Sequence, residues 1–192
     1  KINVGIIGSG SRGQGIIKLL NEQNGYNVLG VCDNIPFRLN EGRKLNNNRK
    51  VKPYSDYRNL IENKEIDAVI ICTPLNTHAQ IAIDALDSEK HVYCEKTLAK
   101  GINDTNRIVK KCKNSNKIFQ TGHQFHSSRM YKQLVDIILD GKVGSIISIE
   151  AQWNRNGNWR KTVNNPLHER QINWRMYREY SYGLLAELSA HQ

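Results

Sequence analysis

The chain has 192 residues, enough for one large domain or for one domain and part of another. Apolar residues make up 39% and charged residues 24%, and no run approaches the roughly 18 to 20 apolar residues of a membrane span, so we expect a soluble protein outside any membrane. The net charge of +10 comes from scattered Lys and Arg without a basic helix or stripe, which speaks against nucleic-acid binding and suits an anionic pyrophosphate ligand.

The chain opens with a strand, a helix and a second strand. Residues 2–7 form a short, almost continuous apolar run that ends at Gly8, as expected of a parallel strand buried on both faces. From Arg12 the apolar residues recur at helical spacing, and the apolar run 28–32 then ends at Asp33. This order predicts a βαβ unit.

Strands and helices continue to alternate as far as residue 121. We predict helices near 36–45, at 57–62, after Thr77 and at 102–112, and strands around Val51 and at 68–72, 91–94 and 118–121. Thr77 is placed to cap the helix that follows it. Short connections throughout predict an α/β fold with a Rossmann-type, doubly wound parallel sheet and right-handed crossovers.

The pattern changes after Gly122. We predict a helix over residues 130–138 and, from alternating apolar and polar residues, a strand over 145–153. Residues 154–182 are rich in Asn, Arg, Trp and Tyr without periodicity, so we expect a long ordered loop that binds something. The chain thus divides into a nucleotide-binding domain, residues 1–122, and the beginning of a second domain, residues 123–192.

A glycine-rich loop joins the first predicted strand to the first predicted helix. It reads Gly8, Ser9, Gly10, Ser11, Arg12 and Gly13, which is the spacing GxGxxG. The first glycine allows the tight turn, the second lets the backbone approach a pyrophosphate, and the third lets helix and strand pack closely. The helix N-terminus adds amide donors and a favourable dipole, so the loop predicts a dinucleotide site.

An acidic residue at the end of the second strand indicates which dinucleotide is bound. Asp33 lies 20 positions after Gly13, where its carboxylate would accept hydrogen bonds from the adenosine ribose and repel a 2′-phosphate. We therefore expect NAD rather than NADP. Arg38 could reduce this selectivity, because its positive charge could bind a 2′-phosphate. The alternative is that Asp33 only caps the next helix.

The cysteines suggest a reducing compartment and no metal site. Cys32, Cys72, Cys94 and Cys112 show no CxxC spacing, and the first three belong to apolar strand-like runs. We expect free thiols that behave as small hydrophobes. The cytoplasm is the expected compartment, although Lys1 enters a strand directly without an initiator Met, which leaves open a removed export signal.

Two further segments stand at the carboxyl ends of predicted strands, where a doubly wound sheet binds its ligands. They are TPLNTH at 73–78 and EKT at 95–97. Together with GSGSRG at 8–13, GKVG at 141–144 and ELSAH at 187–191, they resemble the Gfo/Idh/MocA oxidoreductases, the family of glucose-fructose oxidoreductase and inositol dehydrogenase. The resemblance covers essentially the whole chain.

The resemblance implies a second, α+β domain with a large open sheet that serves substrate binding and oligomerisation. It also implies that most of this domain is absent here, and that the full-length protein is a dimer or tetramer nearer twice this length. Two positions depart from the family pattern. Thr97 replaces the Pro that stiffens the turn behind Lys96, and Glu187 replaces the usual Asp four positions before His191.

The family's reaction implies roles for three residues. Removing a hydride from a carbinol carbon requires a base for the hydroxyl proton and a cation beside the developing alkoxide. The resemblance assigns Lys96 to orient and polarise the substrate oxygen and His191 to act as general base. Glu187, one helical turn from His191, would position substrate or imidazole.

The resemblance also implies a set of cofactor contacts beyond the glycine-rich loop and Asp33. His123 and Gln124 follow the last strand, where the family's residues approach the nicotinamide and its ribose. His78 has the alternative of capping a helix. The remaining residues of this set are Thr73, Pro74, Leu75, Glu95 and Lys96.

The long loop offers a candidate substrate surface. Its aromatic faces and forked guanidinium donors suit sugars, whose C–H faces stack on indole while their hydroxyls need bidentate partners. The candidates are Trp153, Arg155, Trp159, Arg160, Trp174 and Arg175. With similar weight, the three tryptophans anchor the loop or a subunit interface, since interfaces favour the same residue types.

The leading hypothesis is therefore an NAD-dependent oxidoreductase that acts on a sugar, sugar derivative or cyclitol. A second reading is an NAD-dependent glycoside hydrolase with a transient keto-sugar intermediate, as in some members of the family. A third hypothesis is a non-catalytic NAD-binding regulator. The presence of Lys96 and His191 argues against it.

Overall fold

The computed structural model describes residues 1–154 and 156–191, so Arg155, a candidate substrate residue, lies outside the described residues. Six parallel strands form one sheet in the order β3-β2-β1-β4-β5-β6. Their bounds are β1 Ile2–Ile7, β2 Tyr26–Cys32, β3 Lys52–Tyr54, β4 Ala68–Ile71, β5 His91–Cys94 and β6 Phe119–Thr121. The predicted Rossmann-type sheet is confirmed, with its topological switch point between β1 and β4.

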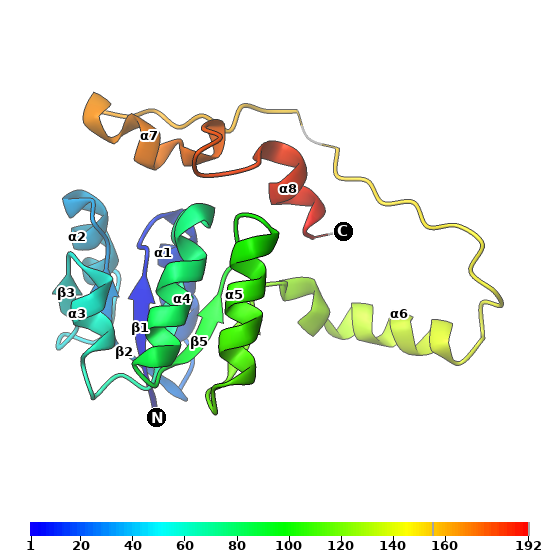
Figure 1. The fold of residues 1–192 in the computed structure, drawn as a ribbon, viewed down its shortest axis with the longest axis horizontal. Helices are drawn as coiled ribbons and strands as arrows, with labels where there is room; N and C mark the ends of the chain where they lie inside the picture. Colours follow the sequence, from blue (N-terminus) through cyan, green and yellow to red (C-terminus); the bar gives the residue numbers. More distant parts are fainter. Residues whose placement is uncertain (155, 192) are drawn as a thin grey trace.

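Helices cover both faces of the sheet (Figure 1). On one face α1 (Ser11–Asn21) packs against α2 (Pro36–Lys44), and on the other α3 (Tyr57–Ile61) and α5 (Ile102–Lys113) flank α4 (His78–Asp87). Each helix begins close to the carboxyl end of the preceding strand, because right-handed crossovers bring the chain back antiparallel to the sheet. The loops that carry the sequence motifs therefore gather along one edge.

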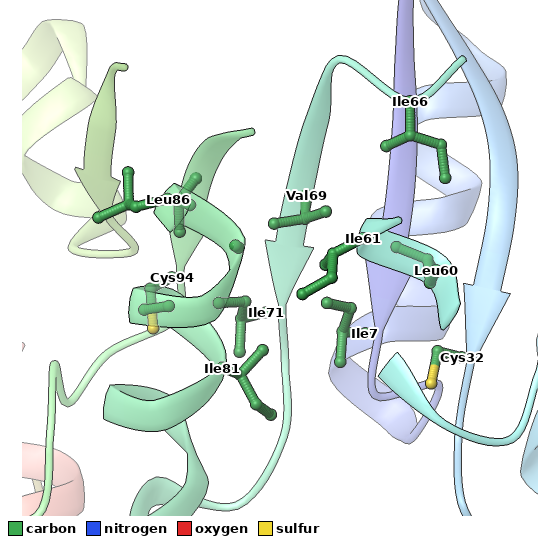
Figure 2. Packing of buried hydrophobic residues seen from close by; sticks show 13 residues of the cluster. Ile7, Cys32, Leu60, Ile61, Ile66, Val69, Ile71, Ile81, Leu86 and Cys94 are labelled. Carbon is green, nitrogen blue, oxygen red and sulfur yellow. The ribbon is translucent and has the colours of Figure 1, made fainter. Parts of the chain in front are cut away.

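The core on the α3 and α4 face is shown in Figure 2. Ile7 and Ile71 project from neighbouring strands β1 and β4 toward Leu60 and Ile81 on the helices, and each of the four is at most 5% exposed. Burying such a side chain contributes about 1.5 to 3 kcal/mol. Cys32 belongs to the same core, and burial raises the pKa of its thiol to about 12, so it behaves as the predicted small hydrophobe.

The predicted strand over residues 145–153 is wrong. These residues follow α6 (Arg129–Leu139), and no described segment pairs with them. Ile147 is 97% exposed and Ile149 85% exposed, so the alternating apolar side chains have no layer to cover. A strand requires a neighbour for its backbone hydrogen bonds, and the sequence pattern alone supplies none. Within the described parts of the chain, no helix is both long and apolar enough to cross a bilayer.

The predicted long loop over 154–182 contains short helices. They are η3 (Pro166–His168), α7 (Glu169–Ile172) and η4 (Trp174–Met176), and the helix α8 (Gly183–Ser189) follows. Single turns of this length carry too little apolar periodicity to be recognised in a sequence. Figure 1 shows this part of the chain lying above the carboxyl ends of the strands. We call residues 156–180 the cover segment.

Thr77 also departs from expectation. It stands at the N-cap position of α4, but its hydroxyl donates to Pro74 O at 2.7 Å and lies 2.8 Å from Thr73 Oγ1, rather than accepting from a helix amide. The turn η1 (Leu75–Thr77) precedes α4 directly and gives Thr77 helical backbone angles. In that conformation the hydroxyl reaches a carbonyl of the previous turn.

Candidate active site

A cavity of about 880 Å³ lies at the carboxyl edge of the sheet and is lined on its other side by residues of the cover segment. Its floor is formed by the residues that follow β1, β2, β4 and β5, and its roof by residues of the cover segment. The candidate residues that line it are Gly8, Gly10, Ser11, Arg12, Asp33, Thr73, Pro74, Glu95, Lys96, Gln124, Trp174, Arg175 and His191. The topology thus brings residues from all the sequence motifs except GKVG to one space.

The glycine-rich loop has the geometry that its sequence requires. Gly8 has a φ of +91°, and a Cβ at this position would lie 2.7 Å from the carbonyl carbon of Cys72. A Cβ at Gly13 would lie 2.0 Å from the carbonyl oxygen of Gly8. Backbone atoms cannot yield to such contacts, so α1 begins directly against the end of β1 and faces its amides toward the cavity.

Asp33 fastens this loop to the end of β2. Its Oδ2 accepts a hydrogen bond of 2.9 Å from the amide of Ser9, and its Oδ1 accepts one of 2.9 Å from the amide of Ile35. No side-chain cap is made to α2, so the alternative in which Asp33 caps that helix is wrong. The carboxylate is 8% exposed and lines the cavity, where its remaining lone pairs can accept from a ribose.

An ion pair ties the glycine-rich loop to the end of β5. Arg12 lies 2.7 Å from Glu95 Oε1, and its second guanidinium nitrogen donates to Gln124 Oε1 at 3.2 Å. Glu95 is further held by the hydroxyl of Tyr93 at 3.3 Å. These contacts fix three loops of the cavity relative to one another.

Lys96 belongs to a buried ion cluster. Its ammonium donates to the backbone carbonyl of Glu187 and lies 3.6 Å from the Oε2 atom of the same residue. Glu187, 1% exposed, also accepts from Arg175 Nε at 3.2 Å and from Ser181 Oγ at 2.9 Å. Burial lowers the pKa of Lys96 and the Glu187 charge opposes this shift, so the cluster controls how readily Lys96 releases a proton.

Thr97 has a bonding role that the family's Pro cannot have. Its hydroxyl donates to the carbonyl of Ala186 in α8 at 3.0 Å. The turn that carries Lys96 is therefore attached to the helix that carries Glu187.

His191 lines the same cavity as Lys96 and follows the end of α8. Trp153 stacks on its ring with centroids 5.7 Å apart, and Phe125 meets it edge-on at 5.6 Å. Its buried Nδ1 has no hydrogen-bond partner among the described residues. Burial and then the Lys96 charge lower the pKa of His191, which favours a neutral imidazole with a nitrogen available for a ligand.

Besides Gly13, four predicted cofactor residues lie outside the cavity lining. Ser9 is fully buried within the glycine-rich loop, and Leu75 is a core residue at 1% exposure. The ring nitrogens of His78 lie 2.9 Å from the carbonyl oxygens of Thr73 and Thr97, so it connects two loops of the cavity wall, and burial lowers its pKa. The fourth, His123, bonds Thr121 Oγ1 at 2.9 Å and borders a small hollow beside His191.

The candidate substrate residues separate into two groups. Trp174 and Arg175 reach the cavity, with the guanidinium 4.2 Å from the indole centroid. Trp153 contacts His191 from outside the lining, Trp159 packs against Arg175 at 5.8 Å, and Arg160 pairs with Glu169 inside the cover segment. Trp159 and Arg160 therefore make contacts within the cover segment, whereas Trp153 packs against Phe125 and His191.

The residues present fit a dinucleotide. Gly8 and Gly13 let the loop turn tightly against the backbone around it, Gly10 leaves the backbone open toward the cavity, and Asp33 lines the same cavity, where its carboxylate could bind a ribose. Two buried polar atoms of cavity residues, Asn76 Oδ1 and His191 Nδ1, have no partner within the described residues, as expected of groups that await a ligand.

Sequence reasoning missed several lining residues, among them Asn76, Gln80, Lys161, Gln171 and Tyr180. Asn76 lies inside the TPLNTH motif, so its position was the available signal. Lys161 and Gln171 lie within residues 154–182, the expected binding loop, but nothing in their local pattern distinguishes them from solvated residues.

Comparisons with known proteins support an NAD-binding Rossmann fold. Residues 2–123 match the model of an oxidoreductase family with an NAD-binding Rossmann fold. The inositol 2-dehydrogenase of Salmonella paratyphi B is 31% identical over 153 residues, 79% of this chain and 45% of that protein. A glycosyl hydrolase family 109 protein of Shewanella pealeana is 26% identical over 183 residues, 92% of this chain and 40% of that protein.

A solved structure of a dehydrogenase has a similar fold. The crystal structure of a myo-inositol 2-dehydrogenase from Lactobacillus plantarum matches with a TM-score of 0.68 and 28% identity, over 76% of this chain and 43% of that one. The chain therefore spans less than half the length of these relatives.

Proposed function

Because this chain belongs to the Gfo/Idh/MocA family of NAD-binding oxidoreductases, we propose that it is part of an enzyme that oxidises a carbinol of a sugar, sugar derivative or cyclitol. The observation that carries the proposal is that Lys96 and His191 line the same cavity as the glycine-rich loop and Asp33. When bound there, NAD supplies the acceptor for the hydride removed from the substrate carbon.

The two candidate catalytic residues have complementary environments. Lys96 holds a positive charge 3.6 Å from a buried carboxylate, so its ammonium can polarise the substrate oxygen and stabilise negative charge on it. His191 has a lowered pKa, and within the described residues its Nδ1 has no hydrogen-bond partner, so the neutral ring can accept the hydroxyl proton. Glu187 does not line the cavity, and we assign it to position Lys96 and Arg175.

The roof of the cavity supplies groups that suit a polyhydroxylated substrate. Trp174 offers an apolar ring face, and the Arg175 guanidinium stacked on it offers several donors in a fixed plane. We propose these two residues as substrate contacts. Trp153, Trp159 and Arg160 support the surrounding structure, and the proposal for Arg155 rests on its sequence alone.

A second candidate function is NAD-dependent glycoside hydrolysis. The likeness to the glycosyl hydrolase family 109 protein extends over 92% of the chain and therefore includes much of the cover segment, whereas the likeness to the inositol dehydrogenase covers 79%. Such a reaction would use the same Lys96 and His191 but would regenerate the cofactor in each turnover.

The wider organisation of the protein is also a proposal. We place the cofactor domain at residues 1–122 and the beginning of the substrate and oligomerisation domain at 123–192. Homo-oligomerisation and a cytoplasmic location follow from the resemblance and the free cysteines, respectively.

The test is an incubation of the full-length protein with NAD and a panel of cyclitols, free sugars and aryl glycosides. Nicotinamide reduction is followed by absorbance while released aglycone is measured in the same mixtures. Net NADH formation with a cyclitol or free sugar supports the oxidoreductase. Aglycone release without net NADH supports the hydrolase, and neither signal with any compound, despite bound NAD, counts against both.

A further inference from the structure

The cover segment places one cation directly on the phosphate-binding loop. Lys161 lines the cavity, and its Nζ donates a hydrogen bond of 2.7 Å to Ser11 Oγ, 150 positions earlier in the chain. Ser11 is the first residue of α1, which is an 11-residue helix that begins in the glycine-rich loop. The ammonium therefore lies at the point toward which the first amides of α1 are directed.

A buried side chain fixes the backbone that carries Lys161. Asn173, 3% exposed, accepts from the Lys161 amide at 2.7 Å through Oδ1 and donates to the Lys161 carbonyl at 3.0 Å through Nδ2. The same Nδ2 donates to Glu169 Oε2 at 3.0 Å, which secures Asn173 itself. Lys161 is thus held over the cavity by a specific contact within the cover segment.

The charges around Lys161 call for an anion. In the described parts of the chain no carboxylate forms an ion pair with it, and the charged groups that lower its pKa are Arg38 and Arg175, both residues of the cavity lining. Burial and the two guanidinium groups lower its pKa, so the arrangement is unfavourable for Lys161 as it stands. An anion bound between these cations and α1 would remove that cost.

We propose that Lys161 is a cofactor-binding residue that transfers its hydrogen bond from Ser11 to the pyrophosphate of the bound dinucleotide. The inference rests on the proposed function, because it takes the cavity to be the NAD site. It adds a contact from outside residues 1–122, so that the cover segment closes the phosphate end of the site. The Ser11 hydroxyl, no longer accepting from Lys161, then donates a hydrogen bond to the same phosphate group.

The experiment compares two probes in the full-length protein. ADP-ribose carries the pyrophosphate, whereas adenosine has the same base and ribose without it. In a Lys161→Met variant, which keeps the apolar stem and removes the charge, we expect about tenfold weaker ADP-ribose binding by calorimetry, since hydrogen bonds to charged groups are the stronger ones. Adenosine binding, followed by NMR titration, should change less than about twofold.

Three companion measurements make the result specific. Lys161→Arg keeps the charge and should restore ADP-ribose affinity to within about threefold of the wild type. Lys113→Met, at the end of α5 remote from the carboxyl edge of the sheet, should leave both affinities unchanged. Inorganic phosphate should compete with ADP-ribose for the wild type at least several-fold better than for Lys161→Met.

The possible outcomes distinguish a failure of the Lys161 assignment from a failure of the proposed function. Unchanged ADP-ribose affinity in Lys161→Met, with normal binding by the wild type, would overturn the role of Lys161 and leave the proposed function intact. An equal loss for ADP-ribose and adenosine would also overturn it, since it would indicate a general disturbance of the site. A wild type that binds neither NAD nor ADP-ribose would remove the proposed function and, with it, this inference.

Discussion

Replacing Glu187 with Gln tests whether a buried carboxylate keeps Lys96 protonated. The two side chains have nearly the same shape, so Glu187→Gln removes one negative charge 3.6 Å from Lys96 Nζ and retains an acceptor for Ser181. At this distance two unit charges interact by about 5 kcal/mol at an effective dielectric constant of 20, and by about 1 kcal/mol in water. The Arg175 guanidinium, 3.2 Å from the same carboxylate, would then repel the ammonium without compensation.

The lower of these energies already corresponds to about one pKa unit. The direction of the change follows from the charge that Lys96 needs for activity. If protonated Lys96 stabilises the developing alkoxide, the loss of the Glu187 charge lowers the Lys96 pKa further and favours the inactive, neutral amine. We therefore expect the alkaline limb of the kcat/KM profile to move down by about one pH unit or more in Glu187→Gln.

The assay is a pH profile of kcat/KM with a substrate identified from the panel, together with the Kd for NAD at each pH. Glu179→Gln is the matched control, because this carboxylate also belongs to the cover segment but pairs with Arg170 in an exposed ion pair. Its profile should coincide with that of the wild type. An alkaline limb that stays in place in Glu187→Gln, while NAD still binds, would refute the coupling between Glu187 and Lys96.

Three further predictions concern the cradle, the base and the cavity wall. Gly13→Ala places a Cβ 2.0 Å from the Gly8 carbonyl oxygen, so we expect at least about tenfold weaker NAD binding by calorimetry and a Tm lowered by several degrees. Because burial lowers the pKa of His191, the acid limb of kcat/KM should lie below about pH 6.5, and a limb above that value would count against His191 as the base. His78→Ala removes a buried link between two backbone carbonyls and should cost about 2 to 4 kcal/mol in urea unfolding, whereas a loss below about 1 kcal/mol would show that the link is dispensable.

Much of the sheet could be predicted because its strands are buried on both faces. Apolar runs such as 2–7 and 68–71 end at Gly8 and Cys72, and each is followed by residues at helical spacing. In a parallel sheet with right-handed crossovers, this order alone places the ends of the runs along one edge. Residues from four of the five motifs therefore line one cavity, and only GKVG contributes none.

The second half of the chain was less predictable, because its structure depends on contacts far apart in sequence. Residues 145–153 alternate as a strand does, but alternation does not supply a neighbouring strand. The role of Asn173 depends on the backbone of Lys161, and the position of Lys161 depends on Ser11 across the cavity. Neither contact leaves a local signal in the sequence.

Asp33 has a structural role that its position in the sequence motif does not indicate. Its spacing from Gly13 indicates a ribose contact, and the structure adds hydrogen bonds to the amides of Ser9 and Ile35. The carboxylate therefore also shapes the loop that precedes α1. A substitution at Asp33 would change both the cofactor preference and the cradle, so it is a poor test of either one alone.

The most direct test of the proposed function is the turnover of a full-length Lys96→Met variant, measured in the same preparation as its Kd for NAD. If Lys96 stabilises charge on the substrate oxygen, turnover should fall by about a hundredfold or more while the Kd stays within about threefold of the wild type. Turnover close to that of the wild type, with NAD bound normally, would contradict the assignment of the chemistry to this cavity.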